Sequence, residues 1–181
     1  GYDVPWEVSS DLLRLYDATN DLRYKMYYGT PFGCTYGTKV AYNTSNGSDH
    51  GIRIAEAYLN RAEAFIRRSL ATGNDGDRVL ALNDLNVLRE TRYMTGSYVD
   101  EQITDANELL EFCLMERRLE LSLEEGFRWF DIKRLGLSVT HVYIDTEGVE
   151  REYILESNSP LYALPIPYDA IERNYRLEQN P

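Results

Sequence analysis

Along the stretch from Gly51 to Leu70, apolar side chains return at three- and four-residue steps. That spacing places them on one face of an α-helix, so the stretch predicts an amphipathic helix. Gly73-Asn74-Asp75-Gly76 ends it, and a second helix is expected to begin with Asp77 as its cap and to run to about Tyr93. The apolar face of the first helix consists of Ile52, Ala55, Leu59, Ala62 and Ile66.

These two helices resemble a tetratricopeptide unit. Ala62 and Phe65 lie three residues apart, as a small and an aromatic residue do in the first helix of that repeat, and Ala81, Leu85 and Leu88 follow the offsets of its second helix. Small residues at these places let two helices approach closely. The connecting turn is expected to be about seven residues longer than in the usual repeat. The pattern therefore indicates an antiparallel helical hairpin more strongly than it indicates a repeat protein.

A third helix is expected from a capping box in which Asp105 is followed three residues later by Glu108. It should continue to about Glu125, where Gly126 interrupts it. Residues 127–135 then continue as an amphipathic helix.

One acid falls inside the apolar stripe of this third helix, which reads Leu109, Phe112, Glu116, Leu119 and Leu123. An unpaired buried carboxylate is costly, so Glu116 is expected to be buried, ionised and bonded to backbone N–H groups or to an arginine. Arg117 and Arg118 are adjacent in sequence, but on a helix their side chains point away from that of Glu116. A partner from another helix is therefore expected, with Arg89, Arg92 and Arg128 as the candidates.

The remaining segments complete a mainly α fold with a small β-hairpin and an extended tail, predicted as a single domain over residues 1–181. Residues 1–50 are expected to be rich in loops, with a short helix after Ser10 and an extended stretch near Tyr24 to Tyr28. Residues 51–135 are helical. Within 136–181, a hairpin should form on either side of Asp145-Thr146-Glu147-Gly148, and the proline-rich tail should hold a short helix from Tyr168 to Arg173.

The composition disfavours several classes of function. With 30 acidic against 19 basic residues the formal net charge is −11, which disfavours nucleic acids and anionic membranes as partners. No uncharged stretch reaches the roughly 18 to 20 residues of a membrane-spanning helix. Cys34, Cys113, His50 and His141 have no metal-ligand spacing, so no metal and no cofactor are predicted.

Tyrosine is the conspicuous residue type, because 15 of the 22 aromatic residues are tyrosines. Tyrosine combines a flat apolar ring with a hydroxyl group, which suits contact with amphipathic ligands such as sugars. The alternative is that these rings are semi-buried packing residues. The candidates for a sugar platform lie in the loop-rich region, where function is often carried, and they are Trp6, Tyr27, Tyr28 and Tyr36.

Three segments in order along the chain resemble the SusD/RagB family. The first is residues 52–64. The second is Glu116-Arg117-Arg118-Leu119-Glu120-Leu121 followed by residues 125–134, and the third is Leu164-Pro165-Ile166-Pro167 with the terminal Gln179-Asn180-Pro181. Asp21-Leu22-Arg23 is similar to a shorter upstream motif of the family.

The chain departs from the family pattern in two ways. Ser122-Leu123-Glu124 places three residues where the family has two, and the extra residue would turn a continuing helix by about 100°. The family's N-terminal part, with its signal and lipidated cysteine, is not matched. The resemblance therefore covers the C-terminal portion of such a protein.

The resemblance implies a mostly helical fold built on tetratricopeptide-like units and a role in nutrient capture. Such proteins are lipid-anchored on the outer face of the Bacteroidetes outer membrane, where they lie over a SusC-like TonB-dependent transporter and capture oligosaccharides for import. The alternative is a tetratricopeptide-like scaffold that binds only protein partners.

The segment from Glu116 to Arg134 holds most of the groups that could serve in catalysis. Carboxylate pairs act as acid and base in glycoside hydrolysis, but here acids alternate with arginines on successive helical turns, which is typical of a structural ion-pair network. No catalytic residue is therefore predicted. The expected network consists of Glu116, Arg117, Glu120, Glu125, Arg128, Asp131 and Arg134.

Overall fold

The computed structural model describes residues 7–29, 36–37, 53–124, 126–174 and 176–180. Two compact units share the chain, Gly1–Glu125 and Gly126–Pro181. The single domain over 1–181 stays a prediction. The boundary between the two units lies near residue 125, whereas the sequence suggested a change of structure near residue 135.

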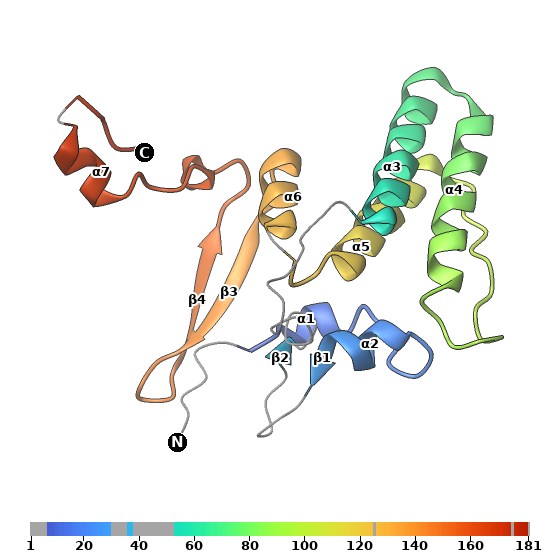
Figure 1. Cartoon of the computed structure of the whole chain (residues 1–181), viewed down its shortest axis with the longest axis horizontal. Helices are drawn as coiled ribbons and strands as arrows, with labels where there is room; N and C mark the ends of the chain where they lie inside the picture. Colours follow the sequence, from blue (N-terminus) through green and yellow to red (C-terminus); the bar gives the residue numbers. More distant parts are fainter. Residues whose placement is uncertain (1–6, 30–35, 38–52, 125, 175, 181) are drawn as a thin grey trace. The chain divides into compact units, whose positions relative to one another are not determined.

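The first unit is helical. Its elements are α1 (Ser10–Leu13), α2 (Leu22–Tyr27), α3 (Ile54–Thr72), α4 (Asp75–Glu90) and α5 (Ala106–Glu120), with a two-residue antiparallel pair between β1 (Tyr28–Gly29) and β2 (Tyr36–Gly37). In Figure 1, α3 and α4 form the expected antiparallel hairpin, and α5 packs against both.

The apolar stripes predicted from the sequence meet in the core of this helical group. Ala62 and Ala81 are both fully buried, as the close approach of α3 and α4 requires. The other buried apolar residues of the three helices are Ala55, Leu59, Ile66, Leu85, Leu88, Leu109, Cys113 and Leu119.

We expect Ala62→Leu to destabilise the first unit by roughly 1 to 3 kcal/mol, because three extra carbon atoms must enter a position with no free surface. Thermal or urea unfolding measures the change. Ala64→Leu is the matched control, since Ala64 lies on the exposed face of the same helix. Equal stability of the two variants would contradict close packing at Ala62.

The start of α4 differs from the expectation. The cap is Asn74, whose side chain accepts a hydrogen bond from the N–H of Gly76, and Asp77 lies inside the first turn. The reason is that the carboxylate of Asp77 is engaged by Arg68 of α3. A left-handed Gly73, with φ of 71°, ends α3 just before this turn.

The end of α4 also comes earlier than predicted, at Glu90 and not near Tyr93. Tertiary hydrogen bonds draw the chain out of the helix at this point. The carbonyl of Arg92 accepts from the N–H of Leu22 at 2.9 Å, and an isolated antiparallel bridge joins Asp21 to Tyr93.

The stretch from Leu22 to Tyr27 is helical, so the prediction of an extended segment is wrong. Asp21 caps α2 by accepting from the N–H of Arg23 at 3.0 Å. The alternation of Tyr24, Met26 and Tyr28 suggested a strand, but α2 is a short helix that places Arg23 inward and leaves Met26 exposed.

The prediction that α5 continues to Glu125 is also wrong. The helix ends at Glu120, with Leu121 as its C-cap, and Leu123 adopts a left-handed conformation with φ of 63°. A left-handed backbone is uncommon for a residue with a branched side chain. The extra residue in Ser122-Leu123-Glu124 is thus absorbed in a turn and does not rotate a continuing helix.

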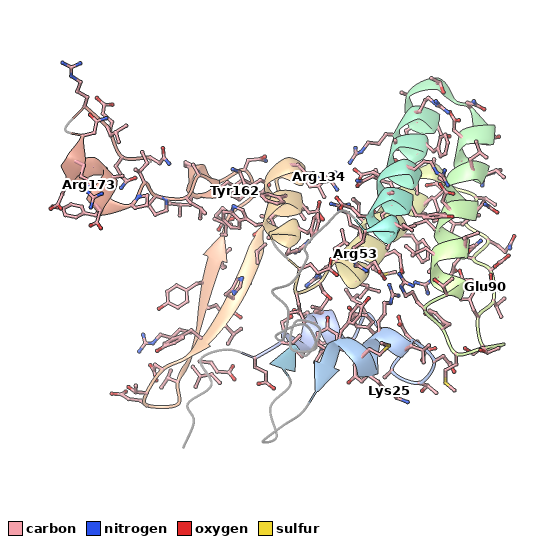
Figure 2. All side chains as sticks on the ribbon, viewed as in Figure 1. Lys25, Arg53, Glu90, Arg134, Tyr162 and Arg173 are labelled. Carbon is pink, nitrogen blue, oxygen red and sulfur yellow. The ribbon has the colours of Figure 1, made fainter. Side chains whose placement is uncertain are left out.

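The second unit contains α6 (Phe127–Leu135), a hairpin of β3 (Val139–Ile144) and β4 (Glu150–Leu155), a 3₁₀ turn η3 (Pro160–Tyr162) and α7 (Tyr168–Arg173). The hairpin and α7 confirm the sequence-based predictions. Tyr162 fastens η3 to α6, because its ring lies 6.4 Å from that of Trp129 and its hydroxyl donates to the carbonyl of Leu137 at 2.5 Å. Figure 2 labels Tyr162 beside α6.

Within the residues that the structure describes, no helix has both the length and the apolar character of a membrane span.

Candidate functional site

The densest concentration of charge is buried in the first unit and is centred on Arg23. This side chain is 1% exposed. It holds Asp21 through two nitrogens, with Nε 3.0 Å from Oδ1 and Nη2 2.8 Å from Oδ2. Its Nη1 donates to Glu116 at 2.6 Å and to Glu120 at 3.2 Å. One guanidinium therefore joins α2 to two successive turns of α5.

Glu116 is fully buried and bonded to arginines from other helices, as predicted from the stripe. Its Oε1 accepts from Arg23, and its Oε2 accepts from Nη1 of Arg89 in α4. Arg89 was one of the three candidate partners. Another, Arg92, binds Glu120 instead, and the third, Arg128, belongs to the second unit.

Glu120 is also fully buried, and two arginines besides Arg23 bind it. Arg92 donates to both of its carboxylate oxygens at 2.9 Å. Arg53, just before α3, donates to Oε1 at 3.2 Å and to the Glu120 carbonyl at 3.1 Å, and it also binds Glu124. Figure 2 shows Arg53 near the C-terminal end of α5. We refer to Asp21, Arg23, Arg53, Arg89, Arg92, Glu116, Glu120 and Glu124 as the arginine–carboxylate network.

The electrostatics of this network favour the charged forms of Arg23, Arg89 and Glu120. Burial alone would lower the pKa of the Arg23 guanidinium, but the carboxylates of Glu116 and Asp21 outweigh it and raise that pKa. Glu116 does the same for the pKa of Arg89. Burial raises the pKa of Glu120. The hydrogen bond from Arg92 and the charges of Arg92, Arg23 and Arg53 lower this pKa by more than burial raises it, so the net shift is downward. A carboxylate held in this way is a poor proton donor or acceptor near neutral pH.

We expect stability to fall in acid through Glu120. Because its pKa in the folded state lies below the unfolded value of about 4.3, its contribution is present above that pH and is lost as the pH falls through the folded pKa. Urea unfolding at stepwise lower pH measures this loss. Glu120→Gln should be less stable at neutral pH and lose less stability in acid. An identical pH dependence in both proteins would contradict the assignment.

Next to the network lies a tyrosine cluster made of Tyr16, Tyr24, Tyr27 and Tyr28. The hydroxyl of Tyr16 donates to the carbonyl of Leu119 at 2.7 Å, and the hydroxyl of Tyr28 lies 2.9 Å from that of Ser122. The two tyrosine hydroxyls are 3.0 Å apart. Burial is the main reason that the pKa of Tyr16 is raised. These contacts attach the segments that follow α1 and α2 to the C-terminal end of α5.

The proposed sugar platform was placed in this region on the premise that it is loop, and for two of its members the premise is wrong. Tyr28 lies in the short strand β1, is 6% exposed and is hydrogen-bonded. Tyr27 ends α2 half-buried, and burial is the main cause that raises its pKa to about 12. Trp6 lies outside the described residues. Tyr36 is described only by its backbone in β2, so its role as a sugar contact stays a prediction.

The structure assigns the other members of the expected ion-pair network to different places. Arg117 donates to Asn60 at 2.8 Å. In the second unit, Asp131 pairs with Arg134 at 2.7 Å, one turn along α6, and Arg128 is exposed. Glu125 lies outside the described residues. Sequence reasoning missed Arg23 and Arg53 as partners, although Asp21-Leu22-Arg23 had already been noted as a motif.

A small groove of about 340 Å³ opens between the start of α3 and the end of α4. It is near the lower limit of the volumes usual for ligand pockets. Arg92, the charged residue among those that line the groove, is already bound to Glu120. The residues that line it are Ile54, Ala55, Tyr58, Val87, Leu88, Thr91 and Arg92.

The comparisons with known proteins agree on one family. The family model described as "SusD family" matches residues 16–181. A SusD-like protein of Formosa agariphila is 32% identical over 130 residues, which are 71% of this chain and 23% of that protein. The chain thus spans about a quarter of the length of that curated relative.

Two solved structures of SusD-like proteins match the chain. A SusD-like carbohydrate binding protein from Bacteroides vulgatus superposes with a TM-score of 0.59 at 22% identity, over 95% of this chain and 41% of that one. A SusD-like protein from Bacteroides fragilis has a TM-score of 0.47 at 29% identity, over 71% of this chain and 25% of that one. The first of these likenesses confirms the mainly helical fold with its small hairpin.

Proposed function

Because this chain belongs to the SusD family, we propose that it forms part of a cell-surface glycan-binding subunit of an outer-membrane import system. In this role it captures oligosaccharides and passes them on unchanged. The observation that carries the proposal is the family match over residues 16–181. The carbohydrate-binding designation of the Bacteroides vulgatus protein, whose fold is similar, supports it.

The partner and the location are proposed on the same ground. A SusC-like TonB-dependent transporter is the expected partner, and a lipid anchor on the outer face of the outer membrane is the expected attachment. The net charge of −11 supports a ligand that is neither nucleic acid nor an anionic membrane.

The geometry of the arginine–carboxylate network supports binding without catalysis. Glu116 and Glu120 are fully buried, and each is bonded to at least two arginines. A glycosidase needs two carboxyl groups that face the scissile bond from opposite sides of a sugar. These two are engaged in joining helices and do not face solvent.

Migration of the chain in native gels that contain a dissolved polysaccharide tests the proposal. Starch, xylan, mannan and laminarin are the probes. We expect retardation by at least one of them relative to a gel without glycan. If no polysaccharide retards the chain, while a TonB-dependent transporter co-purifies with it from outer membranes, the scaffold function is the correct one.

We expect no hydrolysis of oligosaccharides or chromogenic glycosides by this chain. Reducing-end assays and chromatography of the products measure it. Turnover that disappears on changing Glu116, Glu120 or Glu125 would contradict the prediction that these acids are not catalytic.

A further inference from the structure

The hairpin of β3 and β4 in the second unit exposes two tyrosine rings. The strands are antiparallel, and His141 is paired with Tyr153 while Tyr143 is paired with Arg151. Residues directly opposite one another on an antiparallel pair share a face. The hairpin therefore has one aromatic face, formed by His141, Tyr143 and Tyr153 together with Arg151.

The opposite face has a different character. Its rungs are Thr140 with Ile154, Val142 with Glu152, and Ile144 with Glu150. That face is aliphatic and acidic, whereas the aromatic face has rings and only one charged pair. In Figure 1 the two strands run side by side as a two-stranded arm.

The two tyrosines of the aromatic face are open to solvent. Tyr143 is 53% exposed and Tyr153 is 60% exposed. Burial of rings of this size would stabilise the fold, so their exposure gives up stability. Opposite residues on such a face are about 5 Å apart and diagonal ones about 7 to 8 Å, so the three rings occupy neighbouring positions on this face, which we call the platform.

The platform is also held firmly and is nearly neutral. Asp145 accepts from the N–H groups of Glu147 and Val149 at 3.0 Å, which fixes the turn. The same carboxylate pairs with Arg151 at 3.0 Å, so the guanidinium charge on the aromatic face is matched. The rings have few rotatable bonds, and little entropy is lost when they bind a ligand.

We propose that the aromatic face of His141, Tyr143 and Tyr153 is a stacking subsite for a neutral oligosaccharide, an inference that rests on the function proposed above. The apolar faces of sugar rings lie on the tyrosine rings, and sugar hydroxyls bond to the tyrosine hydroxyls and the imidazole. A neutral sugar fits because Arg151 is already paired and the chain's net charge of −11 repels acidic sugars.

Isothermal titration calorimetry of the chain with maltoheptaose, xylohexaose, mannohexaose and laminarihexaose, and with an oligogalacturonate as the acidic probe, tests the subsite. We expect at least one neutral sugar to bind. Tyr153→Ala and Tyr143→Ala should each lower its association constant roughly tenfold. Tyr153→Phe, which keeps the ring, should lose much less.

Val142→Ala is the matched control. Val142 lies beside Tyr143 in β3 but on the opposite face of the hairpin, and it is 58% exposed. It should change the association constant by no more than about twofold. As a second measurement that needs no variant, the ring signals of Tyr143 and Tyr153 in the NMR spectrum should shift when the bound sugar is added.

The possible failures are distinct. If a neutral sugar binds but both tyrosine variants bind like the unmodified chain and the ring signals stay unchanged, the subsite is wrong and the proposed function stands. If only the oligogalacturonate binds, the neutral chemistry of the subsite is wrong. If no oligosaccharide binds, the subsite and the glycan-binding function are both wrong.

Discussion

Glu116→Ala is expected to destabilise the first unit by on the order of 3 to 5 kcal/mol, because it leaves buried arginine charge without its partner. Glu116 is fully buried between Arg23 and Arg89. A loss of this size is a large fraction of the 5 to 15 kcal/mol or so by which most domains are stable. The variant should therefore unfold at a much lower temperature or fail to accumulate as folded protein.

Thermal unfolding followed by circular dichroism, together with urea unfolding, measures this effect. Glu111→Ala is the matched control, since Glu111 lies on the same helix and is exposed. That variant should unfold close to the unmodified chain. An unchanged melting temperature for Glu116→Ala would contradict the structural role of this acid.

Arg23→Ala is expected to have an effect of similar or larger size, on the order of 3 to 5 kcal/mol or more, because it removes the group that Asp21, Glu116 and Glu120 share. Arg23→Lys keeps the charge but cannot reproduce the forked contacts, so it should recover only part of the loss. Arg14→Ala is the control, since its ion pair with Asp11 lies on the surface and contributes little.

A double variant with both Arg23→Ala and Glu116→Ala measures the interaction energy between these two side chains. Because the two residues are in direct contact, the double variant should be more stable than the sum of the two single losses predicts. Strict additivity in urea unfolding would show that the two side chains do not act together.

The regular parts of the fold were predictable because they depend on local patterns. The apolar spacing along α3, α4 and α5, the Asp105 cap, the hairpin around Asp145 to Gly148 and the short helix α7 are all readable from neighbouring residues. The burial of Glu116 followed from the same periodicity, since an acid inside an apolar stripe must lie in the core.

The parts that depend on distant contacts were not predictable in the same way. Arg23 reaches Glu116 across 93 residues of sequence, and no local pattern indicates that pairing. The ends of α4 and α5 are set by tertiary contacts and by the turn at Leu123, which contains no glycine to mark it. The cap at Asp21 was the signal that could have indicated α2.

The candidate ligand surface was harder still to predict. Tyrosine abundance pointed to the loop-rich region, but Tyr28 in β1 proved to be a buried residue whose hydroxyl lies within hydrogen-bond distance of Ser122, just after α5. Tyr143 and Tyr153 look like ordinary strand residues in the sequence. Only the register of the hairpin, and the fact that neither ring is covered, distinguishes them.

Glycan capture without hydrolysis can be tested by calorimetric titration of the chain with an oligosaccharide of the polysaccharide that retards it in native gels. Mass spectrometry of the recovered sugar then shows whether it has been cleaved. We expect a saturable heat of binding and a sugar of unchanged mass. Absence of saturable binding for every oligosaccharide, or recovery of shortened sugar, would contradict this expectation.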